Sequence, residues 1–171
     1  MTLLSDCASA ATAAEARFRI DYPNSRPRAT RIVALDEAAA AAMRKAQTAT
    51  WNDARFLVCL GRSRGVQGLD SIPPDLDLRA PDGSVVRLSD ELSGADAVVM
   101  VATAAADHEA AATIGDACRS RGVAATGLVV APEDTPDALG PTLAALRPTA
   151  RMLVVASEAE YIPEMLAALR A

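Results

Sequence analysis

Apolar residues recur along the chain in short continuous runs, and most runs are followed by a segment of helix-forming composition. The runs lie at 32–35, 55–60, 96–102, 123–130 and 151–156. Short apolar runs bounded by polar or turn residues are typical of buried strands. The helix-forming segments lie at 37–50, 107–121, 136–147 and 163–169. This alternation predicts βαβ units with right-handed connections, and therefore a mainly parallel sheet.

The middle of the chain interrupts this alternation. Residues 61–74 are rich in Gly, Ser, Arg and Pro and predict a loop. Two short strands, 77–79 and 85–88, then flank the turn Pro81-Asp82-Gly83. Proline presets φ at a turn and glycine accepts a positive φ, so this segment predicts a β-hairpin.

Together these elements predict an α/β fold with a mainly parallel, Rossmann-like sheet, helices on both faces and an inserted β-hairpin. A chain of 171 residues fits one domain and can bury about 70% of its unfolded surface. We place that single domain at 31–171. Residues 1–30 are predicted to form an Ala-rich helix at 3–18 and a polar arm.

Composition and charge exclude several classes of function from what is expected of this chain. The formal net charge is −5 and the basic residues are scattered, which argues against binding nucleic acid through its phosphates. Three cysteines lie far apart and there is one histidine, so a structural zinc set is not expected. The odd cysteine number fits a reducing compartment. The amino-terminal segment has no basic start and no apolar run approaches about 20 residues, so a cytoplasmic protein without a membrane span is expected.

Ligands of open α/β sheets bind beyond the carboxyl ends of the strands, near the point where the strand order reverses. The loop after the second run is the strongest candidate there, because glycines let backbone N–H groups point inward and arginines contact phosphates. Its candidate residues are Gly61, Arg62, Arg64, Gly65 and Gly68. It matches neither the GxGxxG nor the GxxxxGK(S/T) spacing of phosphate-binding loops, and the alternative is an ordinary surface loop.

Two further candidates are Thr103 and His108. His108 follows a strand end between Asp107 and Glu109, where a general base could lie, but a solvated residue in a first helical turn is the alternative. Thr103 could donate its hydroxyl to a ligand, or could act as a cap or turn former.

Other reactive residue types have structural interpretations. Cys59 and Cys118 lie in apolar contexts and are interpreted as small buried hydrophobes. The acidic pairs Asp90-Glu91 and Glu133-Asp134 are interpreted as solvated charges at helix starts.

The order of elements from Ile32 onward resembles the nucleotide-binding half of the tubulin/FtsZ family. The resemblance is carried by three stretches, LGRSRGVQG (60–68), LSGADAVVMVATAAADHEAAATIGDACRSRGVAATGLVVAPE (92–133) and RPTARMLVVASEAEYIPEML (147–166). It implies a related sheet and a nucleotide site. At the place of the family's Gly- and Thr-rich phosphate loop, however, this chain has Thr103-Ala104-Ala105-Ala106-Asp107-His108, without glycine.

A second, local resemblance concerns PDLDLRAPDGSVVRLSDEL (74–92), which is similar to the opening hairpin of peroxiredoxin- and thioredoxin-like proteins. In those proteins a catalytic cysteine follows the next strand. Here Val101-Ala102-Thr103 leads to no cysteine, so peroxidase chemistry is not expected.

The sequence therefore favours a non-catalytic α/β domain that acts as a subunit or scaffold through protein–protein contacts, as a homo-oligomer or with a protein partner. The alternative is a nucleotide or anionic small-molecule binding domain that uses the 61–68 loop. A third hypothesis is an enzyme whose site is completed by another subunit, with His108 as base. No cofactor is indicated, and fold analogy cannot choose among these functions.

Overall fold

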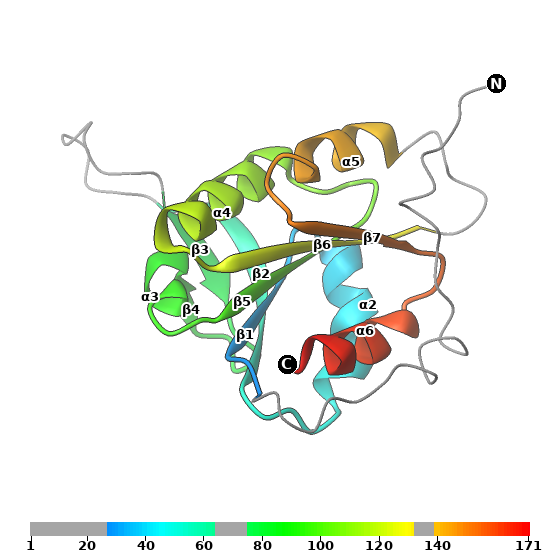
Figure 1. Cartoon of the computed structure of the whole chain (residues 1–171), viewed down its shortest axis with the longest axis horizontal. Helices are drawn as coiled ribbons and strands as arrows, with labels where there is room; N and C mark the ends of the chain where they lie inside the picture. The colour runs from blue at the N-terminus through cyan, green and yellow to red at the C-terminus, as the bar shows by residue number, and fades with distance from the viewer. Residues whose placement is uncertain (1–26, 64–74, 132–138) are drawn as a thin grey trace.

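The computed structural model describes residues 27–63, 75–131 and 139–171 (Figure 1). It contains a seven-stranded sheet with the order β4-β3-β2-β1-β5-β6-β7. The strands are β1 (Thr30–Ala34), β2 (Ala54–Arg62), β3 (Leu76–Arg79), β4 (Val85–Arg87), β5 (Ala97–Ala102), β6 (Ala124–Val130) and β7 (Met152–Ala156). The helices are α2 (Glu37–Gln47), α3 (Leu88–Leu92), α4 (His108–Arg121), α5 (Gly140–Leu146) and α6 (Tyr161–Leu169).

The sheet is mainly parallel, as predicted. β1 pairs in parallel with β2 on one side and with β5 on the other, and β6 and β7 continue the parallel order. β3 and β4 form the predicted antiparallel hairpin and extend the sheet beyond β2. The α/β fold and the inserted hairpin are thus confirmed, and the strand order reverses between β1 and β5.

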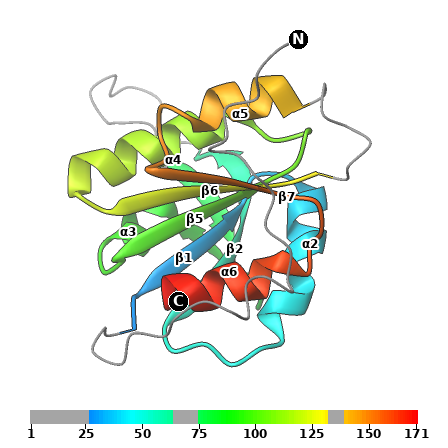
Figure 2. The same ribbon diagram turned by 45° about the vertical axis from the view of Figure 1, so that its right-hand side comes forward.

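Successive residues of the central strands belong in turn to two separate hydrophobic clusters, one on each face of the sheet. Val33 belongs to a cluster that includes Ile114 of α4 and Leu146 of α5. Its neighbour Ile32 belongs to a second cluster, which includes Met43 of α2 and residues of α6. Figures 1 and 2 show α3, α4 and α5 on one side of the sheet, and α2 and α6 on the other.

Local signals explain where the helices begin and end. Asp36 caps α2 through Ala39 N–H, and Asp107 caps α4, whose carboxyl end is Gly122 with φ 70°. This left-handed conformation is one that glycine adopts without strain. In the described residues α5 begins at Gly140, with Pro141 in its first turn; the predicted start at 136 lies outside them.

Several predicted boundaries differ from the structure or lie outside the described residues. The strand predicted at 85–88 ends at Arg87, because Leu88 begins the short helix α3. β1 already starts at Thr30, and the Ala29 carbonyl accepts from Asp96 N–H, so the sheet begins within the predicted arm. The predicted helix at 3–18 lies outside the described residues. No helix in the described ranges combines the length and apolarity that a bilayer crossing requires.

Candidate functional site

The carboxyl ends of β1 and β5 meet where the strand order reverses, and the predicted residues Thr103 and His108 lie at this edge. Asp36 follows β1, and its carboxylate joins the two strand ends. Oδ2 accepts from Thr103 N–H at 2.9 Å, and Oδ1 accepts from Thr103 Oγ1 at 3.1 Å and from Ala39 N–H at 2.7 Å. These three hydrogen bonds of the Asp36 carboxylate hold the start of α2 and the end of β5 next to the end of β1.

A hydrogen-bonded chain links Thr103 with His108 through Thr142 of α5. The Thr142 hydroxyl donates to the Thr103 carbonyl at 3.2 Å and lies 3.5 Å from His108 Nε2. Whether Nε2 donates to this hydroxyl or accepts from it depends on the tautomer of the imidazole ring. Thr142 is buried while His108 is exposed at the start of α4.

Sequence reasoning missed Thr142. It lies 39 residues from Thr103 along the chain, and the only local signal is its place after Gly140-Pro141 at a helix start.

Gly61 and Arg62 belong to β2, so the predicted loop does not begin at residue 61. Gly61 has φ 104°, at an irregularity in the pairing of β2 with β3 between Cys59 and Gly61. A β-bulge of this kind is a place where glycine tolerates a positive φ. Arg64, Gly65 and Gly68 lie outside the described residues.

The environment of Arg62 is not that of a free anion site. Its guanidinium pairs with the Glu109 carboxylate in the first turn of α4. The nearby N–H groups of Glu109 and Ala110 donate to Asp107 Oδ1 at 2.9 and 3.1 Å. An anion at Arg62 would therefore have to displace the Glu109 carboxylate, and an anion at the N–H groups of Glu109 and Ala110 would have to displace Asp107.

The two described cysteines have raised thiol pKa values. Burial raises the pKa of Cys118 to about 11. Burial also raises the pKa of Cys59, which is half-buried, against a smaller lowering effect of the Gly61 backbone. Both thiols are therefore protonated at neutral pH, and the interpretation of Cys118 as a buried hydrophobe is confirmed.

The interpretation of Glu91 as a solvated charge is wrong. Its side chain is only 5% exposed and pairs with Arg31 Nε at 3.1 Å and with Arg55 Nη1 at 2.9 Å. The reason is that α3 turns Glu91 inward against two strands whose register places Arg31 beside Arg55. The sequence carried a signal, since each arginine begins or precedes an apolar run. Asp90 is exposed, as expected.

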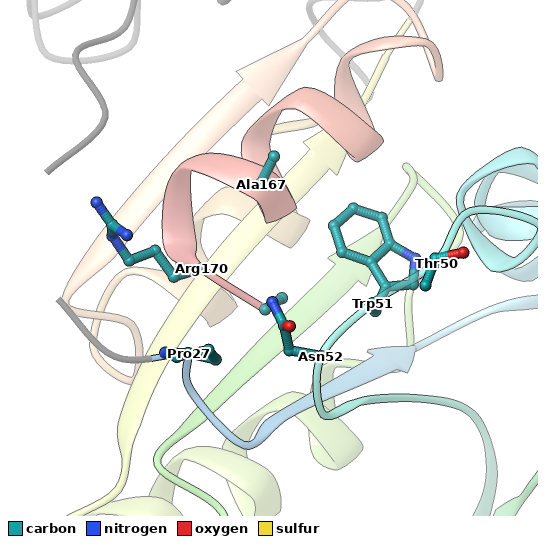
Figure 3. A pocket seen from close by; sticks show the side chains of 7 residues that line it. Pro27, Thr50, Trp51, Asn52, Ala167 and Arg170 are labelled. Atoms are coloured by element: carbon teal, nitrogen blue, oxygen red, sulfur yellow. The ribbon is translucent and has the colours of Figure 1, made fainter. Parts of the chain in front are cut away.

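Two pockets lie away from the carboxyl edge. One pocket has a volume of about 260 Å³ and lies between α6 and the segment that precedes β2. Figure 3 shows Trp51 and Asn52 of this segment near Ala167 of α6, with the Arg170 side chain directed away from Trp51. The other, of about 270 Å³, lies between α2 and the hairpin turn and includes Arg44 and Arg79. Both are smaller than the roughly 300–1,000 Å³ typical of small-molecule sites.

The described residues contain no group of three or more metal-ligating side chains arranged to hold an ion. Comparisons with protein-family models, curated proteins and solved structures found no match to this chain. The resemblance to the tubulin/FtsZ family stays a prediction.

Proposed function

We propose that this protein is a non-catalytic α/β domain that acts as a subunit or scaffold through protein–protein contacts made at the outer edge of β7. All five residues of β7 are apolar. The strand pairs with β6 on one side. Among the described residues, no strand pairs with its other side. This apolar, unpaired edge is the observation that carries the proposal.

The exposure of β7 supports this role. Met152 is 41% exposed and the next three residues are half-buried. Figure 2 shows β7 at the margin of the sheet, with α5 on one side and α6 on the other. An apolar edge strand presents a row of backbone N–H and C=O groups that template the addition of another strand.

The polar groups of the carboxyl edge have a different role in this proposal. Thr103 donates to Asp36 and accepts from Thr142, and Arg62 pairs with Glu109. They hold helices α2, α4 and α5 against the strands. A reducing, cytoplasmic location is part of the proposal, in keeping with the unbridged thiols of Cys59 and Cys118.

The test compares two lysine substitutions in the full chain, expressed in its native host. Val154→Lys puts a charge in β7, and Val85→Lys puts the same charge in β4 at the opposite edge. Native mass spectrometry of gently purified protein should show an assembly for the wild type and for Val85→Lys, and a monomer for Val154→Lys. An assembly that is unchanged by Val154→Lys, with circular dichroism showing a folded protein, would refute the role of β7.

Binding of a nucleotide or another small anion is our alternative proposal. One observation favours it: Arg62, Thr103 and His108 all come to the carboxyl edge, where α/β sheets bind ligands. The probe is ATP, titrated into the purified protein and followed by calorimetry. Saturable binding that Arg62→Ala weakens supports this alternative, and binding that Arg62→Ala leaves unchanged removes it.

A further inference from the structure

We infer that residues 3–18 of this chain dock, as an amphipathic helix, on the side of β2, β3 and β4 that faces α2. This surface is separate from the β7 edge, and the inference does not rest on the proposed function. Residues 3–18 lie outside the described residues, and their sequence predicts a helix.

In the described part of the chain, β3 and β4 have helices packed against only one side. Leu78 of β3 lies in the hydrophobic cluster shared with α4. On the other side, the register places Val58 opposite Arg79, and Arg79 opposite Val85. Arg79 pairs with Glu37 of α2, so this is the α2 side, and the hydrophobic cluster there contains no residue of β3 or β4. We call this side of β2, β3 and β4 the open face.

The open face carries apolar side chains next to basic ones. Val85 is 60% exposed, and Leu60, two residues along β2 from Val58, is 47% exposed. A pocket of about 270 Å³ between α2 and the hairpin turn reaches Val58. Arg44 of α2 borders this pocket and Arg87 ends β4; both are exposed, and neither forms an ion pair within the described ranges. The surface therefore suits an apolar helix face that is flanked by carboxylates.

The sequence of residues 3–18 has this pattern. Apolar residues recur there at spacings of three and four, so that on a helix they form a single stripe: Leu4, Cys7, Ala11, Ala14 and Phe18. A helix of this length is about 24 Å long, and a strand of the length of β2 spans about 30 Å. The stripe can thus follow the open face along its whole length.

Charge complementarity favours the same match. Asp6 and Glu15 are the only charged residues among residues 1–16, and both are acidic. On a helix they lie on the two flanks of the apolar stripe. They would approach a surface whose unpaired charges, Arg44 and Arg87, are both positive.

The described chain begins on the side of the sheet where the open face lies. Arg28 N–H donates to the Arg170 carbonyl at 2.8 Å, at the end of α6. Figures 1 and 2 show α6 and α2 on this same side. β3 lies two strands away from β1 in the sheet, a distance of about 10 Å. Residues 19–27 can span roughly 30 Å when extended, so the segment reaches the open face of its own chain.

The experiment places a nitroxide spin label on the full chain at Ser9→Cys and uses NMR to record which backbone amide signals it broadens. Ser9 lies on the polar side of the predicted helix, so the label leaves the stripe free. Cys7→Ala and Cys59→Ser remove the other accessible thiols, whereas Cys118 is buried. At low protein concentration, the amide signals of β3 and β4 should be lost, and those of β7 should be retained.

Two further substitutions in the labelled chain form a matched pair. Ala11→Lys and Ala13→Lys put the same charge into the same predicted helix, but only Ala11 lies on the stripe. Ala11→Lys should restore the amide signals of β3 and β4, because a buried lysine would face the arginines of the open face. Ala13→Lys should leave them broadened. An equal response to the two substitutions would overturn docking through the stripe.

The other outcomes are equally distinct. Broadening of β7 in place of β3 and β4 would overturn the inference and place the segment at the β7 edge, and an absence of broadening at all three strands would overturn docking on the sheet. Broadening in a mixture in which the label and the observed amides are on different chains would assign the open face to a second copy and overturn the same-chain occupant. Each of these results leaves the test of the proposed function with Val154→Lys unaffected, so the two can fail separately.

Discussion

The two lateral edges of the sheet differ in length and in chemistry. β4 has three residues, ends in the exposed Arg87 and is followed at once by α3. β7 has five residues, all apolar, without charge or proline. Natural sheets protect their edges with short strands, charges and covering elements, and β4 has the first two features. β7 has none of them, although Val85 of β4 is more exposed, at 60%, than any residue of β7. In our proposal β7 is the interaction edge, so exposure of one apolar side chain is a poorer guide to such an edge than the continuity of the strand.

Buried ion pairs stabilise the side of the sheet that ends in β4, and removing them is the substitution for which we expect the largest loss of stability. α3, next to β4, is anchored through Glu91, which is paired with Arg31 and Arg55. Glu91→Ala removes the buried carboxylate from Arg31, which keeps only the exposed Asp53 at 3.9 Å, and should lower the free energy of unfolding by about 3–5 kcal/mol. Urea denaturation measures this free energy of unfolding. Asp90→Ala, one residue away and exposed, should change it by about 0.5 kcal/mol or less. Equal losses in the two variants would show that the ion pairs do not hold this side.

Cys118 lies in the hydrophobic cluster that also contains residues of α3 and α5. The ionisation of its thiol makes the stability of this core depend on pH. Its folded pKa is about 11 against an ordinary 9.0, so the folded state binds the proton more tightly than the unfolded state. This contribution is fully present below about pH 9 and is lost as the pH rises through about 11. The loss should total about 2–3 kcal/mol in the wild type relative to Cys118→Ala. Stability curves of the two proteins that stay parallel from pH 8 to 11 would contradict the burial of this thiol.

Two glycines differ in the space around them, one in α4 near the segment that leads into β7 and one after α3. A Cβ on Gly115 of α4 would overlap with Thr149 Cβ, in the segment that leads into β7. Gly115→Ala should therefore destabilise the protein by about 1–2 kcal/mol, since overpacking outweighs the gain in helix propensity. Gly94, after α3, has open space around it, and Gly94→Ala should be neutral. Thermal unfolding of both variants checks this, and a neutral Gly115→Ala would mean that α4 and Thr149 are less closely packed than described.

The smallest effect concerns the charge on β4. Arg87→Val makes this strand wholly apolar but leaves it three residues long. We expect the dissociation constant of the assembly to change by less than about threefold, because the shortness of β4 still limits pairing at this edge. Sedimentation equilibrium of Arg87→Val alone and combined with Val154→Lys measures it. New association in the combined variant would show that charge, and not length, protects β4.

Much of the fold was predictable because its signals are local. The alternation of apolar runs with helix formers, the cap Asp107 and the turn Pro81-Asp82-Gly83 each act within a few residues. The burial of Glu91 and the place of Thr142 were not predictable, since both depend on partners far along the chain. The same holds for β7: its sequence is typical of a buried strand, and only the strand order places it at an edge.

Amide exchange within β7 tests the central claim most directly. The Ala156 carbonyl accepts from Ala131 N–H, so Val154 also directs its backbone groups to β6, whereas Leu153 and Val155 direct theirs outward. At low protein concentration, NMR should therefore show fast exchange for the amides of Leu153 and Val155 and slow exchange for Val154. At high concentration Leu153 and Val155 should become protected, while exchange at Arg87 on β4 stays unchanged. Fast exchange of Leu153 and Val155 at every concentration would contradict pairing at this edge. Protection that is already complete in the monomer would show that another segment of the same chain occupies it.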